Sequence, residues 1–200
     1  MRLIDTMFKF FLKLILIFIL TTKLYADDVR DLEIDGMSLG DSALKYYTKK
    51  ELNNALEKFY YKNKKFMYYF LSGSKLGEYD AIQITVKPND KNYIMYNIDG
   101  HISYDRKMEE CYDRMEEAKK DINSIISIKS FSDKGSHPMD KTGNSKYSRI
   151  GYIFNKAGDL AEIICYDMSK KYEEQGKLDR FAITLGLGEF KKFLTNEAYK

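Results

Sequence analysis

The feature that most constrains the fold is an alternation of apolar and polar residues that begins at Ile82. Between Ile82 and Val86 every second residue is a branched aliphatic, which is the period-2 pattern of a strand with one buried face. The turn-forming residues Pro88-Asn89-Asp90 follow, and the alternation resumes from 93 to 98. The stretch 79–104 therefore predicts an antiparallel hairpin.

Further strands are expected on both sides of this hairpin. Asp99-Gly100 has the chemistry of a tight turn, so residues 101–104 are expected to form a short third strand. Phe66 to Leu71 has no charged residue and predicts a strand buried on both faces. Strands are also expected at 147–154, 160–166 and 181–185, where apolar residues dominate or alternate. The segment 129–147 is rich in Ser, Gly, Asp and Lys and predicts a long loop.

Helical signals lie before, between and after these strands. Asp41 or Ser42 is placed to cap a short helix, and Thr48 with Glu51 has the spacing of a capping box for a helix that continues to Phe59. From 105 to 128 the apolar period changes to that of an amphipathic helix, with a stripe of Met108, Cys111, Tyr112, Met115, Ala118, Ile122, Ile125 and Ile126. A last helix carries Phe190, Phe193 and Leu194.

These elements predict an α+β fold. We expect a mostly antiparallel sheet of about six strands, covered by one long amphipathic helix at 105–128 and by shorter terminal helices. The charged residues of the long helix are interpreted as its solvated face, with a partner-binding helix as the alternative. One domain is expected from 27 to 200.

Residues 1–26 have the composition of a secretory signal peptide. Arg2, Lys9 and Lys13 surround the start of an apolar run, and Ala26 closes the segment with a small residue at the expected cleavage site. A transmembrane helix needs about 20 predominantly apolar residues, so no stable membrane span is expected after cleavage. An uncleaved anchor is the alternative. Because Asp27 follows the expected cut, a lipid-bearing cysteine is excluded there, and the predicted location is periplasmic or secreted.

The positive charge of the chain belongs to this leader. The whole sequence carries +3, and so do residues 1–26, which leaves residues 27–200 neutral. Proteins that bind nucleic acid generally show a basic patch or stripe. A nucleic-acid partner is therefore not expected.

The two cysteines, Cys111 and Cys165, are the most informative polar pair. Cys111 lies on the apolar stripe of the predicted long helix, and Cys165 lies in a strand that this helix would cover. An even cysteine count in an exported chain favours a disulfide, and two buried free thiols are the alternative. Without a Cys-x-x-Cys motif, a redox role is not indicated.

The sequence contains no pattern that identifies catalytic, metal or cofactor-binding residues. His101 has Asp99 and Asp105 nearby, but their spacing is not that of a metal site, and His137 falls in the predicted loop. No Gly-x-Ser-x-Gly elbow presents a nucleophile, and Gly186-Leu187-Gly188 lacks the third glycine of a dinucleotide site. A set of tyrosines is interpreted as sheet core rather than as a ligand groove: Tyr60, Tyr61, Tyr68, Tyr69, Tyr93, Tyr96 and Tyr104.

Two stretches carry a resemblance. Ile34 to Leu44 (IDGMSLGDSAL) resembles the opening of a family of small, uncharacterised exported bacterial proteins. Ile163 to Ser169 (IICYDMS), with Asp179-Arg180-Phe181 and Glu189-Phe190, resembles the C-terminal end of the same family. The resemblance implies family membership across most of the mature chain but no activity. The Gly-Met-Ser turn is also similar to the BamE-like domains of outer-membrane assembly lipoproteins, whose lipid-bearing cysteine this chain lacks.

The function that these observations favour is a non-catalytic binding or interaction module of the periplasm or cell envelope. Its partner would be an envelope protein or a small ligand, and no cofactor is expected. We expect the contact surface at the loop 129–147 and at an exposed edge near His101. The alternative is a periplasmic hydrolase, which would require Asp or His side chains to converge in the fold.

Overall fold

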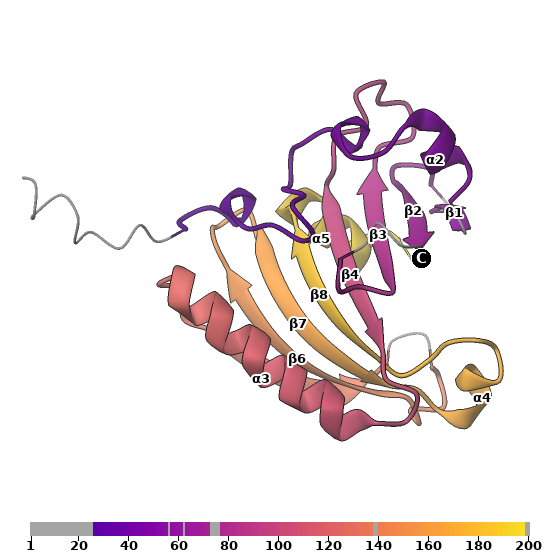
Figure 1. The fold of residues 1–200 in the computed structure, drawn as a ribbon, viewed down its shortest axis with the longest axis vertical. Helices are drawn as coiled ribbons and strands as arrows, with labels where there is room; N and C mark the ends of the chain where they lie inside the picture. The colour runs from indigo at the N-terminus through magenta and orange to yellow at the C-terminus, as the bar shows by residue number, and fades with distance from the viewer. Residues whose placement is uncertain (1–25, 56, 62, 73–76, 138–139, 199–200) are drawn as a thin grey trace, which may run out of the picture.

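The computed structural model describes residues 26–55, 57–61, 63–72, 77–137 and 140–198 (Figure 1). The predicted signal peptide falls almost entirely outside these ranges. Within them, eight strands form one antiparallel sheet in the order β1-β2-β3-β4-β8-β7-β6-β5. The strands are β1 (Glu57–Tyr60), β2 (Met67–Ser72), β3 (Ala81–Val86), β4 (Asn97–Ser103), β5 (Phe131–Ser136), β6 (Lys146–Ile153), β7 (Leu160–Asp167) and β8 (Arg180–Gly186).

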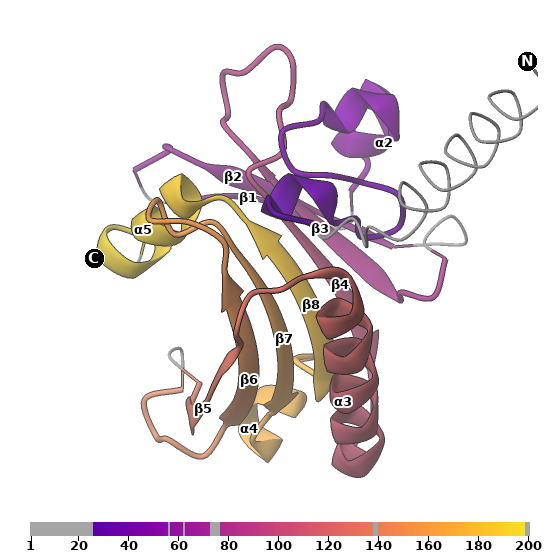
Figure 2. The same cartoon turned by 90° about the vertical axis from the view of Figure 1, so that its left-hand side faces the viewer.

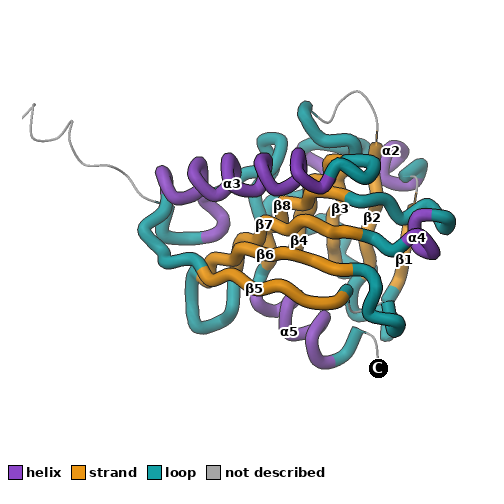
Figure 3. Tube along the Cα trace, turned by 90° about the horizontal axis from the view of Figure 1, so that it is seen from below, coloured by secondary structure: helices purple, strands orange, loops and turns teal. Residues whose placement is uncertain are grey.

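Among the described residues, the helices are short except for one. They are α2 (Lys49–Asn53), α3 (Met108–Ile125), α4 (Lys170–Glu173) and α5 (Gly188–Asn196), with single 3-10 turns η1 (Val29–Asp31) and η2 (Ala43–Lys45). The two longest, α3 and α5, lie on opposite faces of the sheet (Figure 3). We call the side that carries α3 the helix face and the other side the polar face.

The sheet consists of two meanders that the last strand joins. Strands β1 to β4 pair in chain order, and so do β5 to β7. Strand β8 lies between them and pairs with β4 on one side and β7 on the other (Figure 2). The chain passes from the first meander to the second through α3.

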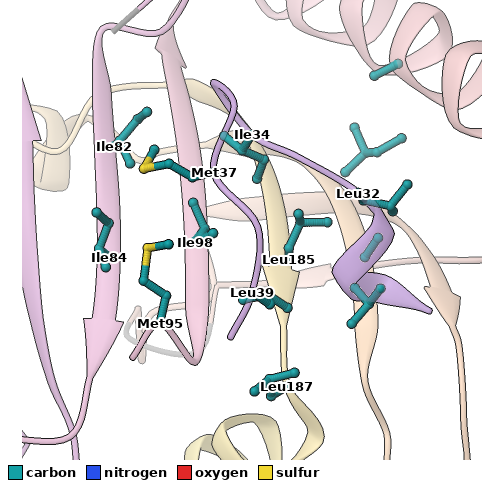
Figure 4. Packing of buried hydrophobic residues seen from close by; sticks show 14 of the residues in the cluster. Leu32, Ile34, Met37, Leu39, Ile82, Ile84, Met95, Ile98, Leu185 and Leu187 are labelled. Carbon is teal, nitrogen blue, oxygen red and sulfur yellow. The ribbon is translucent and has the colours of Figure 1, made fainter. Parts of the chain in front are cut away.

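The core of the helix face is built from two covering segments. Helix α3 packs against β7 and β8, and it buries Cys111, Met115, Ala118 and Ile122. The segment that precedes α2 lies over β3, β4 and β8 (Figure 4). It contributes Leu32, Ile34, Met37 and Leu39 to the same cluster as Ile82, Ile84, Ile98 and Leu185.

The expectation that one long helix covers a sheet of about six strands is therefore wrong. The sheet dominates the fold, and α3 contacts mainly two of its eight strands. The reason is geometric, because a helix about 10 Å across covers about two strands that are spaced about 4.8 Å apart. The rest of the helix face is covered by largely irregular chain, which has no periodicity for sequence analysis to detect.

The predicted caps are confirmed. The Ser42 side chain accepts a hydrogen bond from the Leu44 backbone at the start of η2. Thr48 and Glu51 form a reciprocal capping box at the start of α2. However, α2 ends at Asn53, and Phe59 lies in edge strand β1 instead of in a continued helix.

The predicted hairpin is present, but its second strand is displaced. Strands β3 and β4 pair with Ile84 opposite Ile98. Strand β4 begins at Asn97 and continues without a turn through Asp99-Gly100. The turn prediction was wrong. Gly100 instead allows the Tyr79 ring to pack closely against the strand backbone, because a Cβ at this position would lie 2.6 Å from that ring.

Two other strand predictions need correction. The segment 129–147 contains edge strand β5 and is not one loop. The stretch that was expected to be buried on both faces, β2, alternates between buried and more exposed residues. Strands β6, β7 and β8 and helix α5 lie where the sequence predicts them. Cys111 of α3 and Cys165 of β7 form the predicted disulfide.

Candidate functional site: the polar face of the sheet

The polar face carries an unusual number of buried polar side chains. Strand residues alternate between the two faces, and the register places Gln83 opposite Asp99, Asp99 opposite Thr184, and Thr184 opposite Glu162. These four residues form a row across β3, β4, β8 and β7. Asp99, Thr184 and Glu162 are all less than 9% exposed, although in the described chain a helix, α5, lies over just one end of this face (Figure 3).

Asp99 is held by three neighbours on its own face. Its Oδ1 accepts a hydrogen bond from Thr184 Oγ1 at 2.6 Å, and its Oδ2 accepts bonds from Asn97 Nδ2 at 2.6 Å and Gln83 Nε2 at 2.9 Å. Hydrogen bonds to a charged acceptor are stronger than those between neutral groups. The carboxylate is thus oriented by strands β3, β4 and β8 together.

Glu162 lies between two cations. Its Oε1 accepts from Arg149 of β6 at 2.8 Å, and its Oε2 accepts from Lys191 of α5 at 2.9 Å. Burial alone would raise the pKa of Glu162, but the two cations outweigh it and lower this pKa below its ordinary value. Arg149 also pairs with Asp133 of β5, so one chain of ion pairs runs from the helix to the sheet edge.

His101 is the residue on this face whose polar atoms are least satisfied. It lies on β4 opposite Ala81 and Ala182, and the Phe70 ring lies 5.7 Å away. Both ring nitrogens are buried and have no hydrogen-bond partner in the described chain. Burial, helped by the positive charge of Arg180 and opposed by Asp99, lowers the pKa of His101 to about 4. The imidazole is therefore neutral at pH 7.

Two more unpartnered atoms belong to the same face. Thr85 Oγ1 and Asn97 Oδ1 are buried without a partner, and these residues lie opposite each other on β3 and β4. In native proteins most buried side-chain polar atoms are hydrogen-bonded to protein or to ordered water. Among the described side chains, the buried polar atoms without a hydrogen-bond partner thus all lie on one face, beside the hydrogen-bonded row.

Tyr166 lies on the same face, on β7, opposite Arg180 of β8. Burial raises the pKa of the Tyr166 hydroxyl to about 12, further above the pH 7 at which a tyrosine is already neutral. The Arg180 guanidinium lies 4.6 Å from the centre of the Tyr166 ring, and the His137 ring lies 5.3 Å from it. The polar face thus offers a neutral imidazole, a neutral phenol and a cation that is stacked on an aromatic ring.

The sequence-predicted residues are only partly brought together. Asp99 and His101 share the polar face, whereas Asp105 lies in the turn after β4 with a positive φ of 35°. In the described ranges, no three His, Cys, Asp or Glu side chains come close enough to hold a metal ion. The prediction of an exposed edge near His101 is wrong, because β4 lies inside the sheet between β3 and β8.

Sequence reasoning missed Glu162, Arg149 and Thr184. A signal was present for Glu162, because it is the one charged residue inside the apolar run of β7. Charged residues are almost never fully buried unless they are paired. No comparable signal marks Thr184, whose role depends on the pairing of β8 with β4.

A groove of about 510 Å³ lies between α3 and edge strand β5. Its lining includes Tyr112 and Met115 of α3 and residues 130–134, so it includes part of the segment expected to form the contact surface. Its acids are already paired, Glu116 with Lys119 and Asp133 with Arg149. The groove offers no unsatisfied buried group and is the weaker candidate.

Comparison with known proteins does not assign this chain to a family. No protein-family model, no curated protein and no solved structure matches this chain. In the part of the chain that the structure describes, no helix combines the length and apolar character needed to cross a bilayer. The disulfide is consistent with an extracellular or periplasmic protein, because disulfides persist in oxidising compartments.

Proposed function

We propose that this chain is a non-catalytic binding protein of the bacterial cell envelope, exported by its leader, which holds a small polar ligand against the polar face of its sheet. The observation that carries the proposal is His101, whose two buried ring nitrogens have no partner in the described chain. Burying a polar group without a hydrogen bond is unfavourable by about 1–3 kcal/mol. A ligand that bonds to this imidazole would recover that energy.

The chemistry of the face favours a neutral ligand. A neutral imidazole has one donor and one acceptor nitrogen, so the ligand needs an acceptor and a donor of its own, as hydroxyl and amide groups provide. The nearby charges balance in number, with Asp99, Asp133 and Glu162 against Arg149, Arg180 and Lys191, so neither sign is in excess to favour an ion. Phe70 beside His101 supplies an apolar surface for a flat or methylene part of the ligand.

A periplasmic hydrolase is the alternative. It is favoured by the placement of Asp99, His101 and Glu162 on one face. Against it, Glu162 is held ionised by two cations, and the Asp99 oxygens are already occupied by three donors. A general acid or base needs a pKa near the working pH, and the pKa of His101 is displaced from that range.

The experiment is native mass spectrometry of protein purified gently from the envelope of its own host. We expect a species heavier than the polypeptide, whose extra mass is lost on denaturation. The His101→Phe variant keeps an aromatic ring of similar size but has no nitrogen, and it should lose that mass. Tyr112→Phe, on α3 at the opposite face, is the control and should retain it.

The outcomes separate the two functions. Extra mass that persists in His101→Phe would contradict the proposed site. Turnover of hydrolase substrates that is abolished in the same variant would favour the enzyme. The polypeptide mass itself tests export: a chain that begins at Asp27 and lacks two hydrogens would agree with cleavage and a disulfide, whereas a retained leader would place the protein at the membrane.

A further inference from the structure

The two edges of the sheet differ in how they can meet another strand. Strand β1 ends the sheet on one side and β5 ends it on the other. All four side chains of β1 are exposed, including Phe59 at 41% and Tyr60 at 44%. An exposed edge strand with large apolar side chains is a template for pairing with another strand.

Symmetry limits how such an edge can pair with its own copy. Two identical antiparallel strands in one continuous sheet are related by a two-fold axis normal to the sheet. Residues directly opposite each other in an antiparallel pair point to the same face, and the axis preserves the faces. Because side chains alternate along a strand, a residue can lie opposite only itself or a residue an even number of positions away.

For β1 this rule leaves two registers that align most of the strand. One is centred on Lys58 and places two lysines directly opposite each other, which is destabilising. The other is centred on Phe59. It stacks Phe59 against its own copy, and it places Lys58 opposite Tyr60 of the second chain on both sides of the axis.

The second register repeats contacts that β1 already makes within one chain. The Lys58 ammonium lies 5.9 Å from the Tyr60 ring centre and 5.5 Å from the Tyr69 ring centre. Phe59 stacks on Tyr68 of the neighbouring strand with centroids 5.2 Å apart. Aromatic cross-strand pairs and cation–π pairs are each worth about 0.5–1 kcal/mol. The register thus continues the side-chain ladder across the axis.

The opposite edge rejects the same arrangement. For β5, the two registers closest to full alignment are centred on Asp133 and Lys134. The first places two aspartates opposite each other and the second places two lysines opposite each other, and both are destabilising. Charged side chains on an edge strand are a common means of preventing edge-to-edge association. The two edges therefore differ in self-pairing: of these two strands, β1 can pair with its own copy without placing like charges opposite each other, and β5 cannot.

We propose that two copies of this chain associate through β1, in the register centred on Phe59, to form one continuous sheet across the two-fold axis. The paired strands are short, so the dimer is weak and depends on concentration, as expected for an interface smaller than the roughly 1,200 Å² of stable complexes. The β5 edge stays free of this association.

Sedimentation velocity of the full exported chain tests the proposal over about 1 μM to about 1 mM, the range of weak association. We expect the mass to rise from one to two protomers. Phe59→Asp places two carboxylates on the axis and should raise the dissociation constant at least about tenfold. Tyr112→Asp is the matched control, because Tyr112 has a similar exposure of 40% on α3, and it should dimerise as the parent does.

Cross-linking locates the axis independently. In the proposed register, Phe59→Cys brings two thiols opposite each other at about 4.5–5.5 Å between Cβ atoms, close enough to be joined with a small backbone shift. Mild oxidation should give covalent dimers of Phe59→Cys much faster than of Lys134→Cys. A monomer at every concentration, a dimer that survives Phe59→Asp, or equal cross-linking of the two cysteine variants would each overturn the proposal.

Discussion

The side chains of strand β7 alternate between the two faces of the sheet, so this one strand allows the faces to be compared. Toward the helix face it presents Ala161, Ile163 and Cys165, all at most 1% exposed. Toward the polar face it presents Glu162, Ile164 and Tyr166, which lie among ion pairs and hydrogen bonds. The first set is stabilised by apolar burial and the disulfide, and the second by directional bonds between charged and polar groups.

The two faces differ in how they contribute to stability. Apolar burial is non-directional, and close packing of the helix face supplies most of the folding free energy. A buried polar network adds little net stability, because desolvation offsets the attraction between its members. The helix face therefore supplies most of the stability, and the polar face carries the candidate site.

The largest expected effect lies on the helix face. Substitution of both Cys111 and Cys165 by Ser removes a cross-link between residues 54 positions apart. The chain-entropy model gives a loss of about 4 kcal/mol in the free energy of unfolding. Urea denaturation under oxidising conditions measures it, and the parent protein with a reducing agent is the control. Equal midpoints for the variant and the oxidised parent would contradict the structural role of the disulfide.

The next comparison uses neighbours in one strand. Ile163→Ala removes a fully buried side chain on the helix face and is expected to lower the free energy of unfolding by about 3 kcal/mol. Ile164→Ala, on the polar face, should lower it by less, because that side chain keeps 7% exposure, has Arg149 as one cross-strand neighbour and lies outside the main apolar cluster. If both variants lost the same stability, the two faces would be equivalent in packing.

A substitution within the polar network has a smaller effect. Thr184→Val keeps the shape of the side chain but removes the donor to Asp99 Oδ1. We expect a loss of about 2 kcal/mol, which is typical of a hydrogen bond to a charged group. Thr195→Val on α5 is the control, because the Thr195 hydroxyl donates only to the backbone of its own helix. No difference between these variants in thermal denaturation would show that Asp99 is held by its other partners.

The smallest effect is a pH dependence. The folded pKa of His101 is about 4 and the ordinary value for histidine is 6.5, so between these values the unfolded chain binds more protons than the folded one. The free energy of unfolding is therefore independent of His101 well above pH 6.5 and falls as the pH drops toward 4. At pH 5.5 the loss is about 1 kcal/mol. Denaturation at pH 7.5 and 5.5 measures it. His101→Phe should remove this part, and an unchanged dependence would contradict the burial of the imidazole.

Much of the fold is readable from local pattern. The stripe of α3 and the alternation of β3 and β8 depend on neighbours in sequence, and the caps at Ser42 and Thr48 depend on spacings of two and three residues. The disulfide followed from the position of each cysteine within its own element. Features of this kind predict structure because the physical interaction is local.

The remainder depends on contacts between distant residues. Asp99-Gly100 has turn chemistry, but pairing with β3 and β8 holds it in a strand. The polar segment that became β5 forms a strand because β6 offers it an edge. The candidate site is predictable to a similar extent: His101 and Asp99 were noticed for their residue type, whereas Thr184 and Arg149 acquire a role only when four strands are in register.

The placement of β8 has a consequence for synthesis. The last strand of the chain fills the central position of the sheet, so the two meanders present unpaired edges to each other until residues 180–186 have been made. A ribosome-bound or truncated chain cannot complete its core, because many of its contacts join residues far apart in sequence. The sheet can therefore close only after residues 180–186 have been made.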